Sequence, residues 1–145
     1  MLKNDDDKTT RYEGFISLIK EYDQYQESSN YFDIAVEMAK IDNGYRYYIT
    51  IDNPRIALYD VEALAIENDV DYDATMAANV GIFEETEYNM IPNQHNVDKG
   101  YVEGIVMSAT CDKSNTTLYI LVQWKNADFT ITHRECFCLD CAYGD

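Results

Sequence analysis

The chain has 145 residues, 46% of them hydrophobic, which is enough for one buried core but short for two domains. Eleven Lys and Arg stand against 27 Asp and Glu, and the net charge of −16 argues against direct binding to nucleic acid or to an anionic membrane. No apolar run reaches the roughly 20 residues of a spanning helix, and the acidic N-terminus is unlike a signal peptide. We therefore expect a soluble, intracellular protein.

A first helix is predicted from a repeat of apolar side chains. Residues 1–10 are polar and are expected to be a flexible end. Over residues 11–27, aromatic and aliphatic residues recur at spacings of three and four, which is the pattern of an amphipathic helix. Thr10 and Glu13 fit the two positions of a capping box at its start.

A β-hairpin is predicted next. Residues 32–39 alternate between large apolar side chains and polar or small ones, the period of a half-buried strand. Asn43-Gly44 is the pair preferred in a type I′ turn, so residues 45–51 are expected to form the return strand.

The middle of the chain is predicted to be helical and then irregular. Residues 60–68 have the composition of a short helix with Asp60 as its N-cap, and a second helical turn is expected over residues 73–79, ended by Gly81. Residues 84–98 hold few apolar side chains and are expected to be a long exposed loop.

The last third is predicted to be a three-stranded antiparallel meander. Its strands, residues 101–109, 116–124 and 129–137, are separated by two polar, turn-like segments. The sequence therefore predicts an α+β fold in a single domain over residues 11–145. It consists of an N-terminal helix, a β-hairpin, short acidic helices and the C-terminal meander.

Most of the net charge lies in one segment. Residues 56–98 carry ten acidic side chains and neither Lys nor Arg. A charge run is commonly a solvated face that keeps a protein soluble. The alternative is that these carboxylates match the basic groove of a nucleic-acid-binding protein, since duplex DNA carries about one charge per 1.7 Å of its axis. The candidate partner-binding residues are Asp60, Glu62, Glu67, Asp69, Asp71, Asp73, Glu84, Glu85, Glu87, Tyr72 and Tyr88.

Tyrosine is the second compositional feature, with 13 residues in the chain. Tyr buries area at low entropic cost, which favours it at interfaces. Tyr together with carboxylates suits an Arg-rich surface, through ion pairs and cation–π contacts.

One group of residues has the composition of a metal site. His133, Cys136, Cys138 and Cys141 offer one imidazole and three thiolates, the donors of a tetrahedral zinc site. However, His133 and Cys136 would face opposite sides of a strand. The alternatives are free thiols and a disulfide, the latter with Cys111 as one partner.

No enzyme motif is present in the sequence. It lacks a Gly-x-Ser-x-Gly nucleophile and the glycine-rich loops that bind phosphate, and its two histidines define no triad. We therefore expect a protein without catalytic activity and, zinc aside, without a cofactor.

In size, charge and content of Asp, Glu and Tyr, the chain resembles the small acidic inhibitors of phages and mobile elements, such as anti-CRISPR and antirestriction proteins that mimic DNA. The resemblance implies an inhibitor that occupies the basic nucleic-acid-binding surface of a Cas effector or restriction enzyme in the cytoplasm of a bacterial host. The alternative is a small protein–protein interaction module whose site is the C-terminal Cys/His group, with or without zinc.

Overall fold

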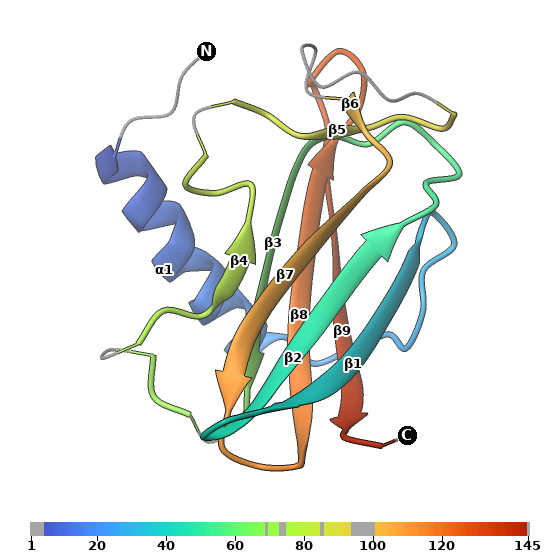
Figure 1. The fold of residues 1–145 in the computed structure, drawn as a ribbon. Coiled ribbons are helices and arrows are strands. Elements are labelled where there is room, and N and C mark those ends of the chain that lie inside the picture. The colour runs from blue at the N-terminus through green and yellow to red at the C-terminus, as the bar shows by residue number, and fades with distance from the viewer. Residues whose placement is uncertain (1–4, 69, 73–74, 85, 94–100, 145) are drawn as a thin grey trace.

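The computed structural model describes residues 5–68, 70–72, 75–84, 86–93 and 101–144 (Figure 1). This part of the chain is mostly β-structure with one helix, so the expected α+β fold with several acidic helices is wrong. In chain order the elements are α1 (Asp5–Glu21), β1 (Asp33–Ile41), β2 (Gly44–Asp52), β3 (Tyr59–Glu67), β4 (Ala78–Val80), β5 (Asn89–Met90), β6 (Tyr101–Val102), β7 (Gly104–Cys111), β8 (Asn115–Lys125) and β9 (Thr132–Ala142).

Two antiparallel sheets enclose the main core. One sheet has the strand order β1-β2-β7 and the other β4-β3-β8-β9, while β5 and β6 form a short parallel pair. The two sheets meet along both pairs of edges, where β1 lies beside β9 and β4 lies beside β7 (Figure 1). Between them pack the inward side chains, which include Tyr47, Ile49, Ile120, Trp124 and Phe137.

The helix α1 covers the outer face of the four-stranded sheet (Figure 1). Its apolar residues Tyr12, Phe15 and Ile19 belong to a second core cluster together with Leu64 and Ile66 of β3. No helix in the described part of the chain is long and apolar enough to cross a membrane.

The helix begins and ends earlier than predicted. It starts at Asp5 and not at residue 11, and it ends at Glu21 and not at residue 27. The Tyr25 hydroxyl donates a hydrogen bond of 2.5 Å to the carbonyl oxygen of Ile19, and the backbone of Gln26 exchanges two hydrogen bonds with β9. These bonds end the helix, because they hold residues 25 and 26 against the sheet.

The strand β3 replaces the helix predicted over residues 60–68. Ala63 and Ala65 face the core between the sheets, whereas Leu64 and Ile66 face α1. A strand covered on both faces needs no alternation of polar and apolar residues, so its sequence resembles that of a buried helix.

The second predicted helix, over residues 73–79, is also absent from the described residues, where residues 78–80 form β4. Gly81 does not end a helix but passes close to β3, with φ at +85°. A Cβ atom added there would collide with the carbonyl oxygen of Val61, so only glycine fits this position.

The predicted hairpin is confirmed, but its turn residues are Asp42 and Asn43 and not the type I′ pair Asn43-Gly44. Of the predicted meander, only the antiparallel pairing of its last two strands is confirmed. β1 and β2 pair along their length, with Ile41 opposite Gly44 at the turn. β7, however, pairs with β2, while β8 lies between β3 and β9. The connection over residues 112–114 therefore crosses from one sheet to the other. Local sequence identifies a strand, but the burial of its inward face selects its partner.

Part of the segment predicted to be a long loop, residues 84–98, instead forms the strand β5. Leu58 and Met90 exchange two backbone hydrogen bonds of 2.8 Å, and Met90 is fully buried. Residues 85 and 94–98 lie outside the described residues.

The contact of Gly81 with β3 predicts a large effect of adding one methyl group. Gly81→Ala is expected to lower the free energy of unfolding by about 2 kcal/mol or more, because the new Cβ meets the β3 backbone at a positive φ. Gly14→Ala is the matched control, since a Cβ there meets no atom within 4 Å on α1 and should stabilise by about 0.5–1 kcal/mol. Urea denaturation measures both, and equal effects would contradict the close approach at Gly81.

Candidate functional site

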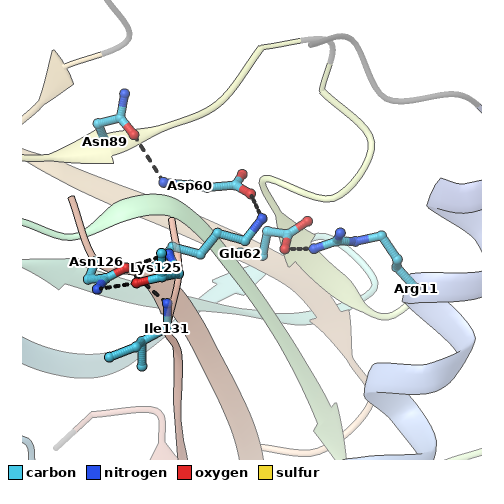
Figure 2. A network of polar contacts seen from close by, with 8 residues as sticks. Arg11, Asp60, Glu62, Asn89, Lys125, Asn126 and Ile131 are labelled. Atoms are coloured by element: carbon cyan, nitrogen blue, oxygen red, sulfur yellow. Dashed lines mark hydrogen bonds and ion pairs between the residues drawn. The ribbon is translucent and has the colours of Figure 1, made fainter. Parts of the chain in front are cut away.

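Two of the candidate partner-binding carboxylates, Asp60 and Glu62, are buried, with exposed fractions of 5% and 1%. Glu62 forms an ion pair with Arg11 of α1, and Asp60 forms one with Lys125 of β8 at 3.2 Å (Figure 2). The backbone N–H of Asp60 also donates to the side-chain oxygen of Asn89 at 3.0 Å. These carboxylates connect β3 with its neighbours and do not lie on a surface where a partner could dock.

Of the other candidates from residues 56–98, Glu67 and Tyr72 lie at one end of β3 and Tyr88 lies at the other. Asp71 is exposed, and the half-buried candidates are Glu67, Glu84, Glu87, Tyr72 and Tyr88. Asp69, Asp73 and Glu85 lie outside the described residues. The structure brings Glu67 and Tyr72 together at one end of β3, where the Glu67 N–H donates to the Tyr72 hydroxyl at 2.8 Å. Tyr88 lies at the other end, where its carbonyl oxygen accepts from the Val61 N–H.

The structure does not bring the four candidate zinc ligands together. Cys136 belongs to the cluster beneath α1, whereas Cys141 belongs to the core between the sheets. Cys138 lies opposite Tyr119, and His133 stacks on Trp124 with ring centroids 5.6 Å apart. The described residues contain no group of three or more side chains that could hold a metal ion, and their cysteines are free thiols. The alternation of side chains along β9 separates the predicted set.

A cleft of about 350 Å³ lies between the β3–β4 connection and the adjoining ends of β2 and β7, and we call it the Glu67 cleft. The residues that line it are Arg46, Tyr47, Glu67, Val70, Tyr72, Thr75, Met76, Ser108, Ala109, Thr110, Cys111 and Asp112. Its volume lies within the range of small-ligand sites, roughly 300–1,000 Å³.

The carboxylate of Glu67 is fixed in place by two neutral donors. Its Oε1 atom accepts a hydrogen bond of 2.9 Å from the Thr116 hydroxyl and one of 3.1 Å from the Cys111 thiol. Both donors come from neighbouring strands, so the position of the carboxylate depends on how β7 and β8 meet β3.

The groups around Glu67 experience a negative potential. Burial raises the pKa of Cys111 to about 11, and the hydrogen bond to Glu67 and the charges of Glu67 and Asp112 act in the same direction. Burial likewise raises the pKa of Tyr47, with smaller contributions from Tyr72 and Glu67. Cys111 therefore stays a protonated, weakly nucleophilic thiol at neutral pH.

A second cleft, of about 410 Å³, reaches Glu67 from the side of α1. It is lined by Tyr25 and Tyr119, whose ring centroids lie 5.1 Å apart. Burial raises the pKa of Tyr25, with a contribution from the exposed Asp23.

Two more exposed carboxylates lie near these tyrosines. Burial raises the pKa of Cys138, which lies opposite Tyr119, and the charges of Asp140 and Glu27 raise it further. Asp23 thus acts on Tyr25, and Glu27 and Asp140 act on Cys138, while the exposed Lys20 lines the same cleft. We call Asp23, Tyr25, Glu27, Tyr119 and Asp140 the tyrosine–carboxylate surface.

Sequence reasoning selected Glu67 and Tyr72 but missed the remaining residues of both clefts. Tyr47 and Ile49 are two residues apart on one strand and so share a face, which does indicate that Tyr47 points inward. No local pattern places Tyr25 beside Tyr119, because their contact depends on the pairing of Gln26 with β9. Cys111 reaches Glu67 only because β7 joins the opposite sheet.

A scan against models of protein families, a search of curated proteins and a search of solved structures find no match to this chain.

The buried ion pair between Arg11 and Glu62 predicts a strong dependence of stability on Arg11. Arg11→Met is expected to lower the free energy of unfolding by about 3 kcal/mol, because it removes the guanidinium that pairs with the buried Glu62 carboxylate. Adding Glu62→Gln should recover most of the loss. The control is Arg55→Met, which removes an exposed pair with Asp33 and should have little effect. Equal losses in the two single variants would contradict the burial of Glu62.

The hydrogen bond between Cys111 and Glu67 predicts how the thiol titrates. Glu67→Gln removes the charge that favours the protonated thiol and leaves a neutral, weaker acceptor, so the pKa of Cys111 should fall from about 11. The carbon-13 chemical shift of its Cβ atom against pH measures this change. Cys136 is the internal control, since burial alone raises its pKa to about 11 and Glu67 has no part in it. A Cys111 titration unchanged by the substitution would show that the contact does not form.

Proposed function

We propose that this protein is an acidic, non-enzymatic inhibitor that binds a nucleic-acid-binding protein or nuclease of a bacterial cytoplasm and occupies its basic nucleic-acid-binding surface. Cas effectors and restriction enzymes are the partners that fit this proposal. The observation that carries it is the charge of −16 together with exposed carboxylates near the tyrosine pair Tyr25 and Tyr119.

The distribution of charge on the described residues supports this proposal. Exposed carboxylates occur on α1, in the connections and along β1, β2 and β9, whereas exposed cations are few. The exposed Lys and Arg side chains of the described residues are Lys20, Lys40, Arg55, Lys113 and Arg134. A field of one sign over most of a surface accelerates encounter with a basic partner and decays with added salt.

The tyrosine–carboxylate surface supplies the chemistry of a contact region. Asp23, Glu27 and Asp140 are exposed and can pair with Lys or Arg, while Tyr25 and Tyr119 present half-buried aromatic rings. Exposed ion pairs contribute only about 0–1 kcal/mol each, so tight binding requires several of them around an aromatic or aliphatic centre. This surface, and not the predicted face over residues 56–98, is therefore the contact region we propose.

Capture from a bacterial lysate, with washes of increasing salt and identification by mass spectrometry, tests the function. We expect one basic nucleic-acid-binding protein to be retained at low salt, released at intermediate salt and displaced by added nucleic acid. Recovery of no specific partner, or of one that added nucleic acid does not displace, would overturn the proposal.

Neutralising the tyrosine–carboxylate surface tests where the partner binds. The triple variant Asp23→Asn, Glu27→Gln, Asp140→Asn should weaken binding roughly tenfold, if each lost pair costs about 0.5 kcal/mol. The triple variant Glu37→Gln, Asp42→Asn, Asp52→Asn makes the same change in net charge on the β1–β2 hairpin and serves as the control. Titration calorimetry with the captured partner measures both affinities. Equal weakening would show that only the total charge matters and that the site is elsewhere.

A further inference from the structure

Four large apolar side chains are exposed at the end of the molecule where β8 turns into β9. Tyr31, Ile56, Phe129 and Ile131 are 40–53% exposed, and we call them the apolar tip. They come from the connections between α1 and β1, β2 and β3, and β8 and β9, and the last two reach the same end of the sheets (Figure 1). Together they expose roughly 350 Å² of apolar surface, a size of patch that often has a function in a monomeric protein.

Contacts with β8 and β3 bring these three connections together. The Tyr31 ring packs edge-on against Trp124 of β8 with 5.8 Å between the ring centroids, and the Phe129 ring lies 6.1 Å from the ring of Tyr59 of β3. The Arg55 N–H donates to the Tyr31 carbonyl oxygen at 2.8 Å, so the connection between β2 and β3 lies against Tyr31. The four side chains of the apolar tip therefore belong to one region of the surface.

Phe129 has a backbone conformation that phenylalanine rarely adopts. Its φ is +61°, in the left-handed region. The other non-glycine residues with positive φ among the described residues are Asn53, Asp60 and Asn93, whose short polar side chains tolerate this region. Glycine or asparagine would suit the turn better than phenylalanine does. Such strain is typical of residues whose side chains have a function, so we look for a contact made by the exposed ring.

Hydrogen bonds within the turn hold it in this conformation. The Asn126 side-chain oxygen accepts from the N–H groups of Thr130 and Ile131, both at 3.0 Å, and the Asn126 N–H donates to the Ile131 carbonyl oxygen at 3.2 Å (Figure 2). The Asp128 carboxylate accepts from the Thr130 hydroxyl at 2.6 Å. The turn therefore loses little conformational freedom when its apolar side chains are covered, which favours binding.

The charges beside the apolar tip cancel. Asp33, Arg55, Lys125 and Asp128 are the Asp, Glu, Lys and Arg side chains within two residues of a tip residue or in contact with a tip ring. Arg55 pairs with Asp33 at 2.6 Å, and Lys125 also pairs with the buried Asp60 at 3.2 Å. The net charge of −16 therefore comes from other parts of the chain. A second copy of this acidic chain meets less repulsion at the tip than at an acidic face.

We propose that the apolar tip binds the apolar tip of a second copy of the chain in a two-fold contact. Phe129 and Ile131 of each copy pack against Tyr31 and Ile56 of the other, so that all four side chains are covered. This end-on contact keeps the acidic parts of the two copies apart. It also leaves the tyrosine–carboxylate surface open, because Asp140 lies near the end of β9 that is far from the tip. The inference does not depend on the proposed function, and it gives the inhibitor two partner-binding surfaces.

Sedimentation equilibrium of the full chain over a range of concentrations tests the contact. We expect a monomer–dimer equilibrium with a Kd of roughly 10–100 µM, because the contact is smaller than that of a stable dimer. Added salt should tighten the dimer about threefold or more, since it screens the repulsion between two acidic chains. A monomer at every concentration would overturn the proposal. A dimer that salt weakens would also overturn it, because such a dimer is held by ion pairs.

Variants of the tip give the second arm of the test. Phe129→Asn with Ile131→Ser should weaken the dimer at least tenfold, and Phe129→Asn alone about fivefold, because large apolar side chains leave the contact in both copies. Asparagine tolerates the positive φ, so the melting temperature of the Phe129→Asn monomer should not fall. The control is Tyr143→Asn with Val106→Ser, which removes side chains of similar exposure outside the tip. Equal weakening by the control, or a lower melting temperature for Phe129→Asn, would contradict the proposed role of the tip.

Dilution of the nitrogen-15-labelled protein locates the contact. The amide signals of residues 126–133 and of Tyr31 and Ile56 should shift between the dimer and the monomer, whereas those of residues 37–43 at the other end of β1 should not. Shifts centred outside the tip would overturn the two-fold contact. If the chain stays monomeric and the tip variants instead lose a captured partner, the tip is a partner contact and the dimer is wrong.

Discussion

The structure depends on the burial of β3 on both of its faces. One face lies in the core between the two sheets and the other lies beneath α1, so the strand joins the two hydrophobic clusters. This strand also carries two carboxylates into the interior, and each must be neutralised there because an unpaired buried charge is strongly unfavourable. Arg11 and Lys125 meet Glu62 and Asp60 and thereby tie α1 and β8 to the same strand (Figure 2).

The two clefts at Glu67 lie where β3 ends and is no longer packed on both faces. Glu67 closes β3 at the edge of both clusters, and there the chain continues into a connection that is only partly packed. The carboxylate is still held by two neighbouring strands, through Thr116 and Cys111, but within the described residues no ion pair with it is formed, although Arg46 and Lys20 line the two clefts. The two clefts therefore share Glu67 because it lies at the boundary between a packed strand and an open connection.

In the proposed function, the negative charge of the protein acts both at long range and in close contacts. The overall charge of −16 acts over distances comparable to the Debye length and sets how fast a basic partner is encountered. Close contacts then determine affinity, and the contact region that we propose for them is the pair of tyrosine rings, Tyr25 and Tyr119, with the exposed carboxylates near it. An inhibitor of this kind competes with nucleic acid because both bind the same basic side chains of the partner.

The sequence by itself determined the negative charge and the hairpin of β1 and β2, because composition is independent of folding and because the alternation of side chains on either side of a short polar turn is local. It did not determine β3, because the sequence pattern of its acidic and apolar residues is also that of a helix. Only the tertiary structure shows that both faces of this strand are buried. Only the tertiary structure paired β7 with β2, separated the four C-terminal zinc candidates, buried Asp60 and Glu62, and brought Cys111 and Tyr47 to Glu67. These features depend on contacts between residues far apart in the chain, and the burial of whole faces decides such contacts.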